Sequence, residues 1–215
     1  MIGFGQLTMI PDPNFEQALI NLGLDNGAIN GSVYTAVIDT VTSLEVNNQN
    51  ISDLTGIEDF TALTNLMCWG NQLTSLDVSQ NTALTTLMCW WNQFTSLDVS
   101  QNTALTALGC AHNQLTTLDV SQNTALTGLW CGYNQLTTLD VSNNTALTTL
   151  KCWDNQITSL DVSNHTALIE FYCQRNQLTT LDVNGALIEF YCQRNQLTTL
   201  DISNNTALGI DRKST

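Results

Sequence analysis

The chain is organised around a unit of 21 residues in which apolar and polar positions recur in a fixed order. In the copy that spans residues 84–104, Leu87 and Cys89 alternate with Met88 and Trp90. This period of two predicts a strand with one buried face and one exposed face. Seven regular copies begin at Leu63, Leu84, Leu105, Leu126, Leu147, Leu168 and Leu187. A short fixed period predicts one elongated solenoid, in which each coil contacts only its neighbours.

The remainder of each unit predicts a coil that has no room for a helix. Phe94, Leu97 and Val99 form a second alternating apolar set, so we expect a second short strand there. Residues 100–104 are polar and turn-forming, and they close the coil. We therefore expect an α/β solenoid that is mostly β, with a parallel concave sheet and short convex turns.

The amino-terminal region predicts a small helical cap. Asp12 suits the N-cap position and Pro13 the first helical position of a helix over residues 12–23, which Gly23 would end. Its buried face would comprise Phe15, Ala18, Leu19 and Leu22. A solenoid needs its open end covered, so we expect this helix to cover the first coil.

Four regions follow from these patterns. We expect residues 1–11 to be the tail of a secretion signal or an arbitrary start of the chain. Residues 12–40 form the cap, with residues 24–40 as a turn-rich connector. Residues 41–210 form about eight coils, of which the first is divergent and carries Gln49 where later coils carry asparagine. Residues 211–215 are a tail.

Two departures from the repeat occur near the carboxyl end. Residues 167–183 recur as residues 186–202 with a single change from Val to Ile, and residues 184–185 replace a longer polar stretch. We expect a tightened convex turn there, with the sheet register kept. The chain then stops in a partial coil without an amphipathic cap, which would allow end-to-end self-association.

Cysteine and asparagine each occupy one position of the repeat. The cysteines are Cys68, Cys89, Cys110, Cys131, Cys152, Cys173 and Cys192. An odd number in one register does not predict a disulfide framework, and the CxxC pairs of a zinc site are absent, so we interpret them as buried thiols. The asparagines are Asn71, Asn92, Asn113, Asn134, Asn155, Asn176 and Asn195. We expect their amides to bind backbone groups where the chain turns.

The net charge of −14 excludes some partners. Nucleic acids and anionic membrane surfaces attract basic stripes, and this chain has only five Lys and Arg residues. No apolar run approaches the length of a membrane-spanning helix, so membrane insertion is not expected.

The repeat resembles a known family. The segment LxxLxCxxNxL is that of leucine-rich repeats with Cys in one Leu position, and the extension LTSLDVSQNTA is similar to the short bacterial IRREKO subclass. Residues 10–23, 41–46 and 51–57 resemble secreted repeat proteins of Bacteroidetes with an internalin-like first coil. The resemblance covers roughly residues 8 to 210. It implies a leucine-rich-repeat solenoid that is secreted or attached to the bacterial cell surface.

Four positions of the repeat vary while almost all others are held. Counted from the cysteine, they are −3, −1, +1 and +2, and they contain all five tryptophans. We expect these side chains to project from the concave sheet and to bind a ligand. The candidate binding residues are Trp69, Met88, Trp90, Trp91, His112, Trp130, Tyr133, Trp153, Asp154, Tyr172, Arg175, Tyr191 and Arg194.

The variable face indicates non-catalytic recognition. Contiguous exposed aromatic side chains are typical of interfaces, and a peptide or protein partner fits best. A glycan is an alternative, because flat rings stack on sugar faces. Aromatic neighbours also stabilise a sheet by stacking on one another. The chain would then be a structural or adhesive spacer.

Catalytic and metal-binding patterns are weak. No nucleophile motif, phosphate loop or zinc helix occurs, so we expect no enzyme activity, metal or cofactor. His112 is interpreted as a contact residue, and His165, which replaces an asparagine of the convex turn, as a solvated one. One aspartate recurs in every regular coil: Asp77, Asp98, Asp119, Asp140, Asp161, Asp182 and Asp201. These aspartates either accept turn hydrogen bonds or bind calcium between coils.

Overall fold

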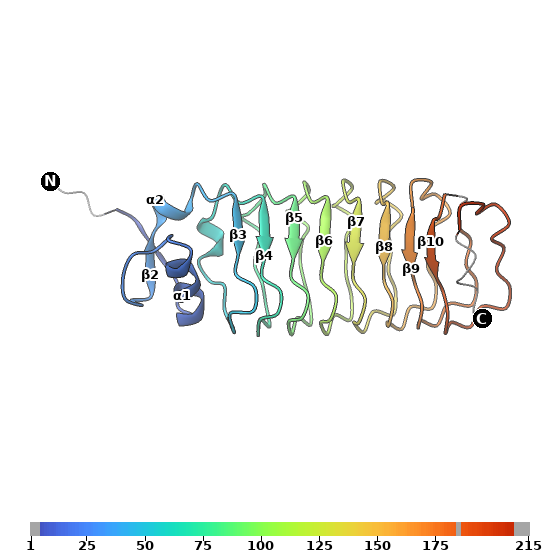
Figure 1. The fold of residues 1–215 in the computed structure, drawn as a ribbon, viewed down its shortest axis with the longest axis horizontal. Coiled ribbons are helices and arrows are strands. Elements are labelled where there is room, and N and C mark those ends of the chain that lie inside the picture. Colours follow the sequence, from blue (N-terminus) through green and yellow to red (C-terminus); the bar gives the residue numbers. More distant parts are fainter. Residues whose placement is uncertain (1–4, 184–185, 209–215) are drawn as a thin grey trace.

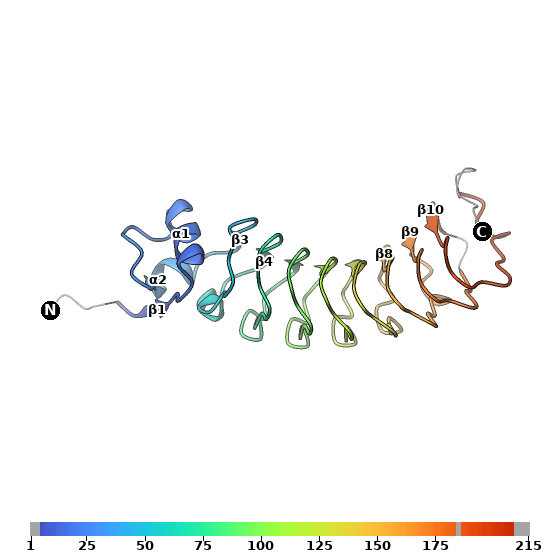
Figure 2. The ribbon, with the colours of Figure 1, turned by 90° about the horizontal axis from the view of Figure 1, so that it is seen from below.

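A computed structural model describes residues 5–183 and 186–208. The chain forms a single row of stacked coils with a small cap at the amino-terminal end (Figure 1). Viewed along the strands, the row is a shallow bow with the strands on its inner side (Figure 2). This is the concave arrangement that the repeat predicts.

The cap contains the predicted helix. Helix α1 spans Pro13–Asn21, and the Asp12 carboxylate accepts hydrogen bonds from the backbone N–H groups of Asn14 and Phe15. The second Asp12 oxygen accepts from the Ser52 backbone N–H at 2.7 Å, so the N-cap also ties the helix to the first coil. Gly23 follows the helix with a φ of 73°, in the left-handed conformation of a helix end.

The buried face of α1 differs from the prediction at one residue. Leu22 is 48% exposed, whereas Glu16 is fully buried beside Phe15 and Leu19. Leu22 was expected on the buried face because it is apolar and has the helical spacing of the other buried residues. Glu16 is buried because its two carboxylate oxygens accept the backbone N–H groups of Asn30 and Gly31, which compensates for the lost hydration.

The connector over residues 24–40 is more ordered than the sequence indicates. It contains strand β2 (Ser32–Tyr34) and the short helix α2 (Thr35–Ile38). β2 pairs antiparallel with β1 (Leu7–Met9), so residues 7–9 are part of the folded cap. Ile10, Val33 and Ile38 are buried in the core that the cap shares with the first coil.

Within the described residues, the main sheet has eight parallel strands in sequential order. They are β3 (Ser43–Glu45), β4 (Asn65–Met67), β5 (Thr86–Met88), β6 (Ala107–Gly109), β7 (Gly128–Trp130), β8 (Thr149–Lys151), β9 (Glu170–Tyr172) and β10 (Glu189–Tyr191). Equivalent residues of neighbouring coils are paired, as Leu87 is with Leu108. β10 pairs with β9 through Glu189 and Glu170, which confirms that the shortened coil keeps the register. The turn at residues 184–185 and the partial coil at 209–215 lie outside the described residues.

The second strand that we expected in each coil is not found among the described residues. Phe94, Leu97 and Val99 are buried as predicted, but the described residues between 94 and 99 contain no strand. The Phe94 backbone N–H donates to the Asn113 side chain and not to a neighbouring strand. Side chains still alternate between core and solvent, and alternation was the only signal that the sequence carried. The first coil has one 3₁₀ turn, η1 (Ile57–Asp59), on its convex side.

The cysteines and asparagines take their expected roles. Six of the seven thiols are buried in the core, and Cys192 in the last strand-bearing coil is half-buried. The Asn92 amide donates to the Cys68 and Cys89 carbonyl oxygens, and its oxygen accepts the Leu73 N–H. The other asparagines of this register repeat the pattern, so the backbone groups at the strand ends are satisfied. In the first coil, Gln49 is exposed, and its N–H donates to Asn71.

A second asparagine ladder, which the sequence pattern did not predict, supports the convex turns. Its members are fully buried or nearly so: Asn81, Asn102, Asn123, Asn144 and Asn205. The Asn102 amide, for example, donates to the Val78 and Asn81 carbonyl oxygens, both at 2.9 Å. His165 occupies this register and is 1% exposed, with Nε2 3.0 Å from the Val141 carbonyl oxygen. The prediction that His165 is solvated is therefore wrong, because the position belongs to the buried ladder.

Candidate recognition surface

The strands place the variable residues on the inner side of the bow. Leu87 and Cys89 are fully buried, whereas Met88 and Trp90, which alternate with them, are partly exposed. The indoles of Trp69, Trp130 and Trp153 are likewise partly exposed. The predicted side-chain directions are therefore those of the structure, with thiols inward and indoles outward.

The residue at position +2 of each regular coil has a left-handed backbone. The φ angle is 53° at Trp91 and His112, 52° at Tyr133 and 50° at Asp154. Gly70, Arg175 and Arg194 share this conformation. Bulky side chains rarely adopt it, and the asparagine that follows holds the turn by binding backbone groups of two coils. The turn directs the +2 side chains outward, so that Trp91 is 54% and Tyr133 42% exposed.

Aromatic rings contact one another across the coils. This aromatic row consists of Trp69, Trp90, Trp91, His112, Tyr133, Trp153, Tyr172 and Tyr191. Its tightest contact stacks His112 on Tyr133, with centroids 4.2 Å apart and planes at 16°. The other ring centroids of the row are 4.6–6.5 Å apart. The row joins candidate residues from seven coils into one continuous surface.

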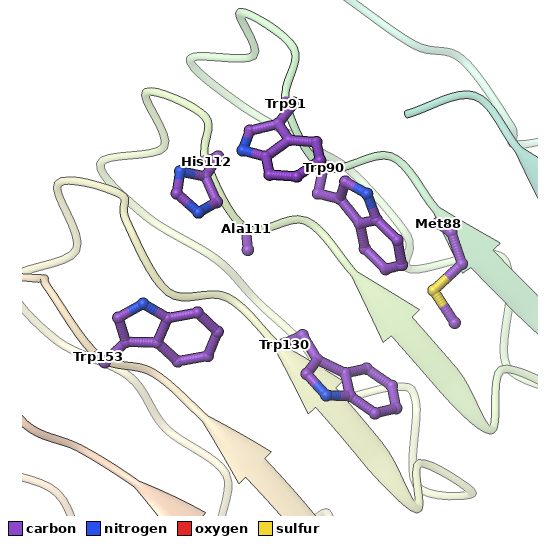
Figure 3. Close-up of a pocket in the computed structure, with 7 residues that line it drawn as sticks. All are labelled: Met88, Trp90, Trp91, Ala111, His112, Trp130 and Trp153. Atoms are coloured by element: carbon purple, nitrogen blue, oxygen red, sulfur yellow. The ribbon is translucent and has the colours of Figure 1, made fainter. Parts of the chain in front are cut away.

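A hollow interrupts the aromatic surface at its middle. This indole pocket has a volume of about 270 Å³, and four indoles line it: those of Trp90, Trp91, Trp130 and Trp153. His112 and Met88 complete the lining, and Ala111 lies between the rings (Figure 3). Ala111 is 5% exposed, so its short side chain sets the floor of the pocket.

Three glycines make room for the indoles. A Cβ atom at Gly132 would lie 2.5 Å from Cδ2 and 2.6 Å from Cε2 of Trp153. These two atoms join the indole rings and carry no hydrogen, so the ring covers Gly132 with its face. A Cβ atom at Gly109 would lie 2.6 Å from the Trp90 ring, and one at Gly128 would lie 2.3 Å from the Trp130 ring. The indole rings therefore pack against these three glycines, where any larger residue would clash with them.

The carboxyl-terminal part of the surface is polar and internally paired. Lys151 forms an ion pair with Glu170 at 2.7 Å, and its Nζ lies 4.3 Å from the centroid of the Tyr172 ring. Arg175 pairs with Asp154 at 3.3 Å, and the Tyr172 hydroxyl donates to Glu189. The two described cations nearest to the indole pocket are thus already neutralised by carboxylates.

His112 is the titratable side chain of the indole pocket. Loss of hydration lowers the pKa of its imidazole below the usual 6.5, and the nearby Asp154 carboxylate opposes this shift. The lowered pKa favours the neutral ring at pH 7. The lining of the pocket is then uncharged.

The repeating aspartates lie in exposed turns. Each of the following carboxylates accepts the backbone N–H of the serine two residues later: Asp77, Asp98, Asp119, Asp140, Asp161 and Asp201. These backbone hydrogen bonds lower the pKa of the carboxyl groups, for example at Asp119. The turn interpretation of the sequence pattern is therefore correct for these six. Within the described ranges, no group of three or more His, Cys, Asp or Glu side chains could hold a metal ion.

The structure brings most candidate binding residues together. Six of them line the indole pocket, and Trp69, Tyr133, Tyr172 and Tyr191 extend the row on both sides of it. Arg194 is exposed and lies far from the pocket along the row of coils. Gly109, Ala111 and Gly132 shape the site but are not among the candidate residues predicted from the sequence. Their signal was the switch from large to small residues at otherwise aromatic positions.

Comparison with known proteins identifies the class of the chain. A family model for the LVIVD repeat matches residues 192–211. Internalin J of Listeria monocytogenes is 55% identical over 42 residues, which are 20% of this chain and 5% of that protein. The solved functional domain of InlJ from Listeria monocytogenes, described as including a cysteine ladder, is 38% identical with a TM-score of 0.76. The alignment covers 97% of this chain and 52% of that domain, so the chain spans about half of its length.

A second solved structure shares the fold. A leucine-rich-repeat protein of Leptospira interrogans has a TM-score of 0.66 at 24% identity, over 75% of this chain and 45% of that one. The chain is a leucine-rich-repeat solenoid with internalin-like homologues. The described helices are too short to span a bilayer.

Proposed function

We propose that the chain is a non-catalytic recognition module that binds a peptide or protein through its aromatic row. The observation that carries the proposal is the contrast between a constant core and a variable face. Leucine, cysteine and asparagine recur in register, whereas the residues around the indole pocket change from coil to coil. A stacking role alone does not need this variation. Half-exposed indoles and tyrosines supply contact area at a low entropic cost.

The proposed setting is outside a bacterial cell, either secreted or on the surface. The similarity to internalins supports this setting, and the expected type from Bacteroidetes remains a prediction. The net charge of −14 disfavours nucleic acid as the partner. End-to-end self-association is a further proposal. Leu197, Leu200 and Ile202 near the carboxyl end are only partly buried, whereas the equivalent residues of the preceding coil, Leu178, Leu181 and Val183, are buried.

Two other functions compete with peptide recognition. A glycan would stack on the same indole faces, but the pocket lining offers few polar atoms to a sugar's hydroxyl groups. A structural or adhesive spacer is supported by the ring contacts themselves, since stacked rings on neighbouring strands stabilise a sheet. Each alternative predicts a different outcome of one experiment.

The experiment screens the chain against peptide and glycan arrays together with the variants Trp90→Ala and Trp153→Ala. We expect peptide binding that each substitution weakens by about tenfold or more, as at interface hot spots. Gln101→Ala and Gln122→Ala on the exposed convex turns are matched controls that should bind as the parent does. Binding confined to glycans would support the glycan alternative. The absence of any ligand, with loss of stability in both tryptophan variants, would support the spacer.

A further inference from the structure

We infer that the indole pocket binds an arginine side chain of a basic partner peptide. The inference rests on the proposed function and names the chemistry of the partner. The pocket volume of about 270 Å³ lies just below the range of sites for drug-sized ligands, which begins at roughly 300 Å³. It therefore suits one long side chain and not a large ligand.

The indole of Trp153 provides a flat platform. One face of the ring covers Gly132, because a Cβ atom there would approach the two ring-fusion atoms. The opposite face points away from Gly132, and Trp153 lines the indole pocket and remains partly exposed. A planar guanidinium stacks on such a face and is attracted by its π electrons. The N–H groups around its edge can stay hydrated at the open side of the pocket.

The charge of the chain favours a cation in this place. The net charge of −14 attracts a basic segment at long range, and the lining carries no positive charge while His112 is neutral. Lys151 and Arg175 do not oppose the ligand as free cations, since each has a carboxylate partner. A cation already rests on this surface one coil further on, where the Lys151 ammonium lies over the Tyr172 ring.

The lining also discriminates between cations. A lysine ammonium is strongly hydrated and needs hydrogen-bond acceptors when it leaves water, and the indole pocket supplies few of them. Arginine is more weakly hydrated, and its methylene groups can lie against Ala111 and the ring edges. Arginine is therefore the expected occupant.

The test titrates the whole chain with four small probes, the Nα-acetyl amides of arginine, citrulline, lysine and leucine. Citrulline has the shape of arginine without its charge. The readout is the set of indole N–H signals in ¹H–¹⁵N spectra, in which four of the five tryptophans belong to the pocket. We expect arginine amide to bind roughly five- to thirtyfold more tightly than citrulline amide. This preference should decrease with added salt, because salt screens the attraction.

Two variants locate the site. Ala111→Leu fills the floor of the pocket, and Trp153→Leu removes the platform but keeps an apolar side chain. Both should abolish the preference for arginine, while Gln174→Leu, which occupies the +1 position outside the pocket, should retain it. Citrulline or leucine amide binding as tightly as arginine amide would overturn the inference but leave peptide recognition intact. No shift with any probe would also overturn it, and the array screen would then decide the proposed function separately.

Discussion

The indole of Trp153 lies face down on Gly132, a residue of the preceding coil. A Cβ atom at Gly132 would come within 2.5 Å of the ring, a distance that real side chains do not adopt. The orientation of the indole therefore depends on the absence of one methyl group in a neighbouring coil. The shape of the pocket depends on contacts between neighbouring coils, because the Trp90 and Trp153 rings each lie against a glycine of an adjacent coil.

The substitution Gly132→Ala tests this dependence. The added methyl group must displace the ring or the backbone, so we expect a destabilisation of about 1–3 kcal/mol. In a Trp153→Ala background the same substitution should cost nearly nothing, because the clashing ring is gone. Urea unfolding of the four proteins measures the coupling between the two sites. Additive costs would show that Trp153 does not lie on Gly132.

The structural roles that could be predicted from the sequence are those that repeat in every coil. Leu87 and Cys89 alternate with exposed residues, and this alternation alone predicts the strand, its buried face and the parallel pairing. Asn92 is recognisable as a turn residue for the same reason. Asn102 and the equivalent asparagines of other coils recur just as regularly, but they lie within a polar stretch. Nothing in that composition separates a buried amide from an exposed one.

Features that depend on the backbone or on neighbouring coils could not be predicted in the same way. The left-handed conformation of Trp91 follows from the turn that Asn92 fixes, whereas tryptophan itself disfavours it. The available signal was the presence of Gly70 and Asp154 in the same register, since glycine and aspartate tolerate the left-handed conformation better than tryptophan does. Predicting the pocket required knowing that the Trp90 ring lies against Gly109 and the Trp153 ring against Gly132. These contacts involve glycines in other coils, which sequence alternation does not describe.

The left-handed residue Trp91 offers a test of backbone strain. With a φ of 53°, a glycine at this position should be more stable than an alanine by about 1 kcal/mol, because only the side chain with a Cβ is strained. We therefore expect Trp91→Gly to unfold at higher urea concentration than Trp91→Ala, although both lose the ring. At the adjacent Trp90, whose φ is not positive, the order should reverse. The same order at both positions would contradict the assigned conformation.

The buried amide of Asn102 is expected to be hard to replace. Asn102→Ala leaves two carbonyl oxygens without their donor, which should cost about 2–4 kcal/mol in urea unfolding. Asn102→His should cost less, because His165 shows that an imidazole fits this register and reaches a carbonyl oxygen. The converse substitution His165→Asn should leave the free energy of unfolding nearly unchanged. A histidine variant at 102 that is less stable than the alanine variant would argue against a shared role.

The thiols should differ in reactivity according to burial. Loss of hydration raises the pKa of Cys68, Cys110 and Cys152 to about 12, and these side chains are fully buried. Cys192 is only half-buried, so it should react first. Alkylation of the native chain with iodoacetamide at pH 8, followed by peptide mass spectrometry, should label Cys192 well before the others. In 8 M urea, used as the control, all seven should react at similar rates. Equal rates in the native chain would show that the core opens readily.

The turn aspartates should lose their stabilising effect in acid. Hydrogen bonds from the Ser121 backbone N–H and then its side chain lower the pKa of Asp119 below the usual 3.8. A carboxyl group whose pKa is lower in the folded chain stabilises the fold above the unfolded value, and this contribution disappears as the pH falls through the folded value. The difference in unfolding free energy between the parent and Asp119→Ala should therefore be larger at pH 7 than at pH 2.5.

Carboxyl ¹³C titration should place the Asp119 pKa below 3.8. Ser121→Ala should raise it only partly, since the backbone donor remains; a pKa at or above 3.8 in the parent would mean that the turn hydrogen bond does not form in solution.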